Sequence, residues 1–266
     1  FSPFKPQRNK RTVDQPASTD HLSSAVIDCL KRRASVRAFT TEPVPDEMIE
    51  AVLNAAKHAP TSSNLQAYSF VVVRDTDTKA ILAELAGGQQ HINEASVMVA
   101  ICADINRLGH VIEIGGGSLA HGHLEMSLVA VIDAALVGMS ASLAADSLGL
   151  GGCMIGGMRN DPLGVAKALG LPTGVFVAFG MTLGWPAERP PSKPRYADEG
   201  LIHWERYEAK PLDILTANYN ADLEAQKVTT GRADGVPWAE RLAKGFSQPK
   251  RTELKAVLSE LGFDFE

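Results

Sequence analysis

The sequence predicts one α+β domain, in which a small sheet is layered with helices around a long apolar helix. Short apolar segments of β type are few and are separated by helical patterns, which indicates an α+β fold or a mixed sheet layered with helices. Residues 124–148 are apolar or small on every side of a helix, so this helix must be covered all round. The chain has 266 residues, 45% of them apolar, which suffices for one packed core.

A membrane-spanning helix is the alternative interpretation of residues 124–148. Asp133 interrupts this stretch, and the uncharged run that follows, 134–145, is shorter than the ~18 residues that a bilayer requires. We therefore expect a core helix and no membrane partner. Small residues along the run allow another backbone to approach closely, so part of the covering is expected to come from a second copy of the chain. The sequence thus predicts a homodimer.

The chain divides into an N-terminal arm, residues 1–19, and a single domain, residues 20–266. The arm is rich in proline, glutamine, serine and basic residues, and it is expected to be flexible because it can bury little apolar surface. The first helix is expected to start near Asp20, with Thr19 or Asp20 as its N-cap. Further helices are predicted by apolar periodicity and by proline or glycine at their ends, over 45–58, 78–86, 161–170, 212–226, 238–243 and 252–261.

Three strands are expected, over 69–73, 97–103 and 176–183. Residues 104–123 contain three consecutive glycines and are expected to form a mobile excursion before the long helix. The glycine cluster 149–157 has two interpretations. It either packs as a helix, a turn and a strand, or its bare backbone lets a flat ligand lie close. It is not a dinucleotide-binding fingerprint, because its glycines close a helix instead of opening one.

Charge and cysteine content restrict the class of protein. A net charge of −5 and a pI near 5.8 argue against a general nucleic-acid-binding protein, so no nucleic-acid partner is expected. Cys29, Cys102 and Cys153 lie far apart without metal-ligand spacing, which favours a reducing compartment, by default the cytoplasm. Residues 1–19 lack the apolar core of a signal peptide. His121 and His123 lie at a loop end where histidines are usually solvated, so no metal site is expected.

Two basic clusters are suited to bind an anion. Alternate residues of an extended segment face the same way, so Arg33, Ser35 and Arg37 can present two guanidinium groups and a hydroxyl together. Lys193 and Arg195 alternate in the same manner across a proline that stiffens the segment. A solvated charged loop is the alternative for each cluster taken alone. Two clusters of the same type favour a shared anion site.

Five segments, taken together and in order, form a specific pattern: Arg33-x-Ser-x-Arg37 with Phe39, the loop 59–66, Gly87-Gly-Gln89, the glycine cluster 148–160, and Gly184-Trp-Pro with Lys193-Pro-Arg195. In these segments the chain resembles the FMN-dependent nitroreductase family, and within it the branch of oxygen-insensitive NADPH nitroreductases and flavin reductases. The resemblance implies a nitroreductase-like fold with a mostly antiparallel mixed sheet, an intertwined homodimer whose C-terminal segments wrap the partner subunit, and FMN bound without a covalent bond at the dimer interface.

The resemblance also implies roles for individual residues. It assigns the FMN phosphate to Arg33, Ser35, Lys193 and Arg195, and the N1/O2 edge of the flavin ring to Arg37. The pyrimidine or ribityl portion is assigned to Thr61, Ser62 and Gln89, and the dimethylbenzene and N5 region to Met154, Ile155, Gly156 and Gly157. Arg232 is the one cation in the loop 229–237, where NADPH-preferring relatives hold the 2′-phosphate of the nucleotide.

The activity implied by the resemblance is that of an NAD(P)H oxidoreductase that reduces nitroaromatics, quinones or flavins by two electrons in a ping-pong reaction. No catalytic side chain is expected, because the chemistry takes place at flavin N5. One alternative is a reductive dehalogenase or a flavin-degrading enzyme on the same fold, which would require a lid that only residues 104–123 could supply. The other is a non-catalytic FMN store or sensor.

Overall fold

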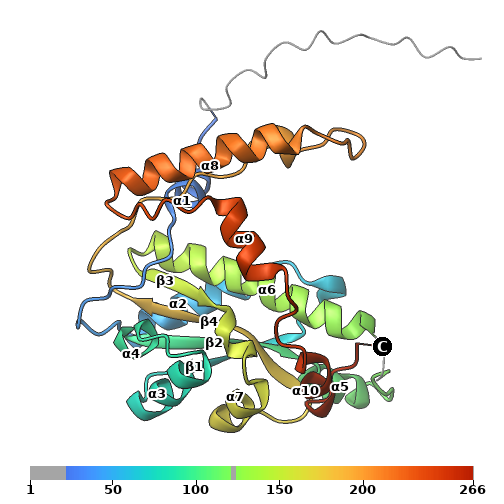
Figure 1. Cartoon of the computed structure of the whole chain (residues 1–266). Coiled ribbons are helices and arrows are strands. Elements are labelled where there is room, and N and C mark those ends of the chain that lie inside the picture. The colour runs from blue at the N-terminus through green and yellow to red at the C-terminus, as the bar shows by residue number, and fades with distance from the viewer. Residues whose placement is uncertain (1–21, 121–123, 266) are drawn as a thin grey trace, which may run out of the picture.

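The structure, a computed structural model, describes residues 22–120 and 124–265. Its centre is a four-stranded sheet of order β1-β2-β4-β3 in which every pairing is antiparallel (Figure 1). The predicted α+β fold with a mostly antiparallel sheet layered with helices is confirmed. The strands are β1 (Tyr68–Val73), β2 (Val97–Asp104), β3 (Gly151–Ile155) and β4 (Val175–Gly184).

The fourth strand, β3, was not among the three predicted strands. It forms one edge of the sheet and pairs with β4 from Gly151 opposite Gly184 to Ile155 opposite Gly180. A Cβ atom on Gly152 would lie 2.4 Å from the carbonyl oxygen of Thr182, so this strand requires glycine to approach its neighbour. Because glycine has a low strand propensity, residue preferences alone do not predict this strand. One of the two interpretations of the glycine cluster did contain a strand, after a helix and a turn.

Strand β2 lies between two apolar layers and is buried along its whole length. Its alternate residues Val97, Val99, Ile101 and Ala103 pack on one face of the sheet with α2 (Asp46–Ala56) and the long helix α6 (Leu124–Ser147). The opposite face is covered by α3 (Thr76–Leu85), α4 (His91–Glu94) and α7 (Pro162–Leu169). The near-continuous apolar sequence of β2 follows from this two-sided burial.

Helix α6 is the predicted long central helix, and within one chain its burial is one-sided. At Gly138 a Cβ atom would lie 2.5 Å from the Phe179 ring, so the helix approaches β4 closely there. On its other face Leu128, Ile132 and Leu136 are 42%, 54% and 39% exposed. Among the described residues α6 is also the one helix long and apolar enough to span a membrane, but it packs against α2 and the sheet as a core helix does.

Two segments differ from the sequence prediction. Helix α1 (Ala25–Arg32) begins after Ser24, whose hydroxyl accepts a hydrogen bond from the N–H of Ile27 at 3.3 Å, so the expected start at Asp20 is wrong. Residues 106–114 form helix α5 (Asn106–Ile114) and not an irregular excursion, because Leu108 packs into the core. The arm 1–19, His121 and His123 lie outside the described residues.

The C-terminal part consists of α8 (Leu212–Thr229), α9 (Trp238–Phe246) and α10 (Leu254–Glu260), each close to a predicted helix. Figure 1 shows α8 at the top of the view, far from the helices α3 and α7 on the other side of the sheet. Helix α10 returns to α7 and closes the core with Phe263, whose ring packs edge to face against Phe176 at 4.6 Å. The C-terminal helices therefore extend from one side of the sheet to the other.

Candidate cofactor site

A cavity of about 500 Å³ lies between the segment 33–37, the proline-rich segment 190–195 and the helices α8 and α9. Its walls contain six residues that the sequence analysis singled out from three distant stretches, namely Arg33, Ser35, Arg37, Lys193, Arg195 and Arg232. Cations that would repel one another in isolation are thus gathered around one space. Such a donor set favours an anionic ligand.

The segment 33–37 is held by its middle residue. Val36 is buried, and its backbone N–H donates to the carbonyl of Gly152 in β3 at 3.0 Å. A Cβ atom on Gly151 would lie 2.7 Å from the Val36 side chain, so the glycine makes room for this anchor. Because side chains alternate along an extended chain, Ser35 and Arg37 face away from the core when Val36 faces into it. Both line the cavity, as the sequence pattern predicts.

Helix α8 holds the segment that carries Lys193 and Arg195. Gln226 Nε2 donates to the carbonyl of Ser192 at 2.5 Å, and the Tyr219 hydroxyl donates to the carbonyl of Pro194 at 3.4 Å. The Arg195 guanidinium donates to the carbonyls of Lys193 and Pro194 at 3.1 and 3.3 Å. The backbone of the segment is therefore fixed, while its two cations remain exposed beside the cavity.

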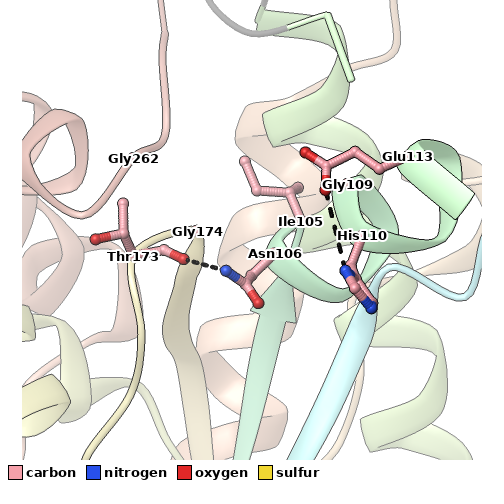
Figure 2. Close-up of a pocket in the computed structure, with 8 residues that line it drawn as sticks. All are labelled: Ile105, Asn106, Gly109, His110, Glu113, Thr173, Gly174 and Gly262. Carbon is pink, nitrogen blue, oxygen red and sulfur yellow. Dashed lines mark hydrogen bonds and ion pairs between the residues drawn. The ribbon is translucent and has the colours of Figure 1, made fainter. Parts of the chain in front are cut away.

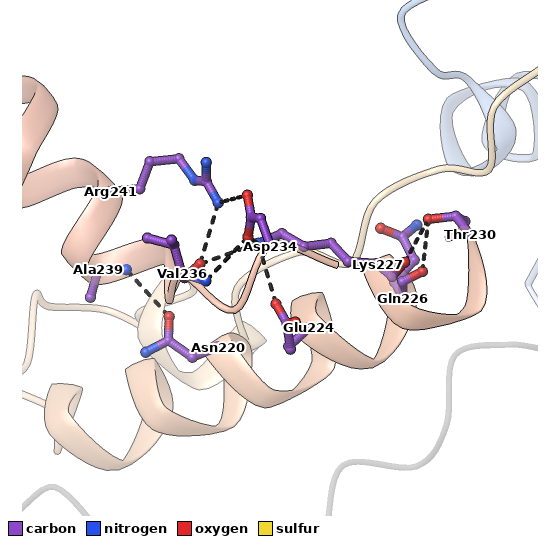
Figure 3. Close-up of polar contacts among 9 residues, drawn as sticks. All are labelled: Asn220, Glu224, Gln226, Lys227, Thr230, Asp234, Val236, Ala239 and Arg241. Carbon is purple, nitrogen blue, oxygen red and sulfur yellow. Dashed lines mark hydrogen bonds and ion pairs between the residues drawn. The ribbon is translucent and has the colours of Figure 1, made fainter. Parts of the chain in front are cut away.

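In the wall formed by α8, α9 and the loop between them, basic side chains are paired with carboxylates (Figure 3). Asp234 accepts from Lys227 Nζ at 2.8 Å and from Arg241 Nη2 at 2.7 Å. These hydrogen bonds, first from Lys227 and then from Arg241, hold the pKa of Asp234 well below its usual range. Arg232, the expected contact of the nucleotide 2′-phosphate, lies 3.3 Å from Glu188. Each of these three cations already has a carboxylate partner.

The loop 61–67 carries Thr61 and Ser62 and is conformationally strained. Ser63, Asn64 and Gln66 have φ values of 46°, 57° and 53°, each of which costs about 1–3 kcal/mol in a residue other than glycine. Thr61 and Ser62 are not among the residues that line the cation-rich cavity. The single chain therefore does not bring these two predicted contacts to the phosphate end of the site.

Asp133 of α6 holds this loop and was missed by the sequence analysis. Its Oδ1 accepts from the N–H of Ser62 and its Oδ2 from the N–H of Ala67, both at 3.0 Å. Arg107 supports the same loop from outside, donating to the carbonyls of Gln66 and Tyr68. An acid in the middle of an apolar helix, together with a polar loop that needs partners, was the available signal.

Gln89 and Gly157 are far apart in the sequence but lie close together in the fold. Gln89 Nε2 donates to the carbonyl of Ala86 at 2.9 Å, and a Cβ atom on Gly157 would lie 2.5 Å from both of these atoms. Glycine at 157 is therefore required for this contact. The Ile155 side chain packs in the buried cluster on the α3 side of the sheet, so only its backbone can face a ligand, whereas Met154 is half-buried.

Arg251, in the turn before α10, is a second residue that the sequence analysis missed. Its Nε and Nη2 donate to Asn160 Oδ1 at 3.0 and 2.8 Å, and Nη2 also lies 3.5 Å from the carbonyl of Gly156. The C-terminal segment thus supports the glycine turn 156–157. No local sequence pattern predicts a contact between residues so far apart in the sequence.

His91 adds a titratable group near Arg37. Burial lowers the pKa of His91, and the charge of Arg37 lowers it further. Its Nε2 atom is buried, and no group among the described residues forms a hydrogen bond with it. The imidazole is therefore neutral near pH 7, so it adds no positive charge to the Arg37 side of the site.

A separate cavity of about 370 Å³ lies beside α5 (Figure 2). His110 and Glu113 form an exposed pair at 4.0 Å on its rim, and Asn106 donates to the carbonyl of Thr173 at 3.0 Å. None of the predicted site residues lines it, and no residue of α5 lines the cation-rich cavity. Helix α5 is thus no lid over that cavity within the chain.

Comparison with known proteins decides the family. Residues 30–185 match the nitroreductase family, and residues 193–266 match the C-terminal domain of that family. The chain belongs to the nitroreductase family. It is 37% identical to an oxygen-insensitive NADPH nitroreductase of Salmonella typhimurium, over 90% of this chain and 98% of that protein. It is 34% identical to an NAD(P)H-dependent FMN reductase of Bacillus subtilis, over 91% and 98%.

Solved structures of nitroreductase-fold proteins agree with this assignment. NfrA2 of B. megaterium superposes with a TM-score of 0.87 at 33% identity, covering 92% of this chain and all of the other. An NADPH:FMN oxidoreductase from Vibrio harveyi, solved with NAD⁺, gives a TM-score of 0.83 at 28% identity, covering 91% of this chain and all of the other. The family and fold predicted from the sequence are confirmed, and the relatives bear out the predicted class, an NAD(P)H-dependent oxidoreductase.

Proposed function

We propose that the protein binds FMN and uses NAD(P)H to reduce nitroaromatics, quinones or flavins in a ping-pong reaction. The observation that carries the proposal is the cavity in which Arg33, Arg37, Lys193 and Arg195 converge from distant stretches. When bound, FMN supplies the two-electron transfer between a reduced nicotinamide nucleotide and the acceptor. The nucleotide leaves before the acceptor enters.

The residues present fit FMN. A phosphate dianion favours charge-assisted donors, and Arg33, Lys193 and Arg195 offer two guanidiniums and an ammonium besides the hydroxyl of Ser35. Arg33, Ser35, Lys193 and Arg195 would hold the phosphate. Arg37 would hold the N1/O2 edge of the ring, where negative charge collects on reduction. The remaining proposed contacts are Thr61, Ser62, Gln89, Met154, Ile155, Gly156 and Gly157.

We also propose that the protein is a homodimer. Leu128, Ile132 and Leu136 are spaced four residues apart and form an exposed apolar stripe on α6, which an isolated subunit would leave in water. Trp204 and Tyr207, in the segment that leads to α8, are 81% and 83% exposed. A second subunit covering α6, with the C-terminal segment wrapped around it, would bury both groups. It could also supply Thr61 and Ser62 to the site.

The nucleotide specificity that we propose is use of NADH at least as well as NADPH. A 2′-phosphate gains most from a cation that has no other partner. In the described wall of α8 and α9, Lys227 and Arg241 are bound to Asp234, and Arg232 is paired with Glu188. NADPH would have to displace a carboxylate to gain a contact with Arg232, whereas NADH makes no such demand.

A cytoplasmic location is part of the proposal. Cys29, Cys102 and Cys153 are all free and buried, as expected of a protein kept in a reducing compartment.

An anaerobic titration of the purified protein with NADH and then with NADPH tests the proposed function. We expect a yellow protein whose flavin absorbance bleaches with one equivalent of nucleotide and returns when a quinone is added. Denaturation should release intact FMN. A protein that is colourless and fails to bind added FMN would overturn the proposal. A flavin that binds but is not bleached by either nucleotide would favour the FMN store or sensor.

A further inference from the structure

Asp133 is a carboxylate with no exposed surface in the middle of the apolar helix α6. Burying an ionised carboxylate is unfavourable unless its oxygens accept hydrogen bonds, and an apolar side chain would suit helix packing better. The described residues supply both oxygens with donors, and these donors are the backbone N–H groups of Ser62 and Ala67. What Asp133 contributes is therefore the position of the loop 61–67.

That loop is fixed in a conformation it would not adopt unaided. Three of its non-glycine residues, Ser63, Asn64 and Gln66, have positive φ. Asp133 holds one amide near the start of this strained stretch and one immediately after it, while the side chains of Ser62, Ser63 and Asn64 remain exposed. The result is a rigid backbone with polar side chains directed to its surroundings, which is the arrangement a preorganised binding loop requires.

We propose that Asp133 is a positioning residue of the cofactor site, which fixes the loop 61–67 so that Thr61 and Ser62 can bind the flavin portion of FMN. This inference rests on the proposed function. Because Thr61 and Ser62 are assigned to the pyrimidine or ribityl portion, Asp133 acts on affinity for the flavin itself. Lys193 and Arg195 act on affinity for the phosphate.

Asp133→Asn tests the proposal, because asparagine keeps the size of the side chain but replaces one acceptor by a donor that faces a backbone N–H. We expect faster hydrogen exchange at the amides of Ser62 and Ala67. The dissociation constants of FMN and riboflavin should both rise by about tenfold or more, as expected for one lost hydrogen bond to a charged group. Asp146→Asn is the matched control on the same helix, since Asp146 pairs with Arg32 and Arg189 and not with the loop.

A second variant covers the case in which Asp133→Asn does not fold. Arg107→Met removes the outer support of the loop at an exposed position of α5 without altering the core. It should speed hydrogen exchange in the loop and weaken both flavin affinities, as Asp133→Asn does. Unchanged exchange at Ser62 and Ala67 in Asp133→Asn would overturn the proposal. So would faster exchange with unchanged affinity for both flavins, or a loss confined to FMN. A parent protein that binds neither flavin would instead overturn the proposed function, while exchange would still report whether Asp133 holds the loop.

Discussion

Replacing Lys193 and Arg195 together by alanine should weaken the binding of FMN far more than the binding of riboflavin. Both side chains are exposed beside the cavity, and the Arg195 guanidinium donates only to the carbonyls of Lys193 and Pro194 among the described residues. Neither cation is committed to a carboxylate there, in contrast with Lys227 and Arg241. Both are therefore available to a phosphate.

The size of the effect follows from the number of charged hydrogen bonds removed. Each is worth about 1.5–3 kcal/mol, and each ~1.4 kcal/mol is a factor of ten in affinity. Loss of two such bonds predicts a rise in the FMN dissociation constant on the order of a hundred to ten thousand times. Because both side chains are exposed and screened by salt, we expect the lower part of this range at physiological ionic strength.

Fluorescence titration of the apoprotein with FMN and with riboflavin measures both affinities. Lys57→Ala with Lys167→Ala is the matched control, since it makes the same change in net charge at two exposed lysines that do not line the cavity. We expect this control to bind both flavins as the parent does. A double variant at 193 and 195 that retains parental FMN affinity, or loses riboflavin to the same extent, would refute the assignment of the phosphate.

Three further predictions concern the nucleotide, the dimer and alkaline stability. Arg232→Ala should raise the KM for NADPH and leave the KM for NADH unchanged. Glu188→Gln should lower the KM for NADPH, because it releases Arg232 from its ion pair. Equal effects of either variant on both nucleotides would contradict this role of Arg232. Ile132→Glu places a charge on the exposed stripe of α6 and should yield monomers in sedimentation velocity, whereas a dimer as stable as the parent would argue for another interface. Burial raises the pKa of the Cys102 thiol from its ordinary value of 9.0 to about 12. Between these two pKa values only the unfolded state forms thiolate, so the free energy of unfolding should fall as pH rises from 9 to 12. In urea denaturation, Cys102→Ala should reduce the dependence of the free energy of unfolding on pH between 9 and 12. An equal pH dependence in the variant and the parent would show that Cys102 is not its cause.

The parts of the fold that the sequence predicts are those specified by local pattern. The eight buried residues of β2 and the 24 residues of α6 are recognisable from composition alone. Helix α7 has Asp161 as its N-cap and ends at Gly170 in the left-handed conformation, as its sequence predicts. Strand β3 escapes prediction because Gly151 and Gly152 have weak strand propensity, and their role is visible only beside Val36 and β4.

The same distinction applies to the site. Arg33, Arg37, Lys193 and Arg195 could be paired from their alternation in extended segments, and they do line one cavity. Asp133 stands out as an acid in an apolar helix, but its partners could not be assigned from pattern, because they lie 71 and 66 residues away and are backbone amides. Local spacing predicts which side chains share a face. It does not predict which buried side chain will accept hydrogen bonds from the backbone of a loop far away in the sequence.

Ion pairs divide the cations around the cavity into two groups, which we expect to differ in their affinity for anions. Within the described residues, the cations of 33–37 and 193–195 have no carboxylate partner, so an anion there gains charge-assisted hydrogen bonds without displacing anything. In the second group, Lys227 and Arg241 are paired with Asp234 and Arg232 is paired with Glu188, so an anion must compete with a carboxylate. The proposed ping-pong reaction requires that the cofactor is retained through every turnover and that the nucleotide is released in each one. Uncommitted cations for the cofactor phosphate and paired cations for the nucleotide would meet both requirements in a single cavity.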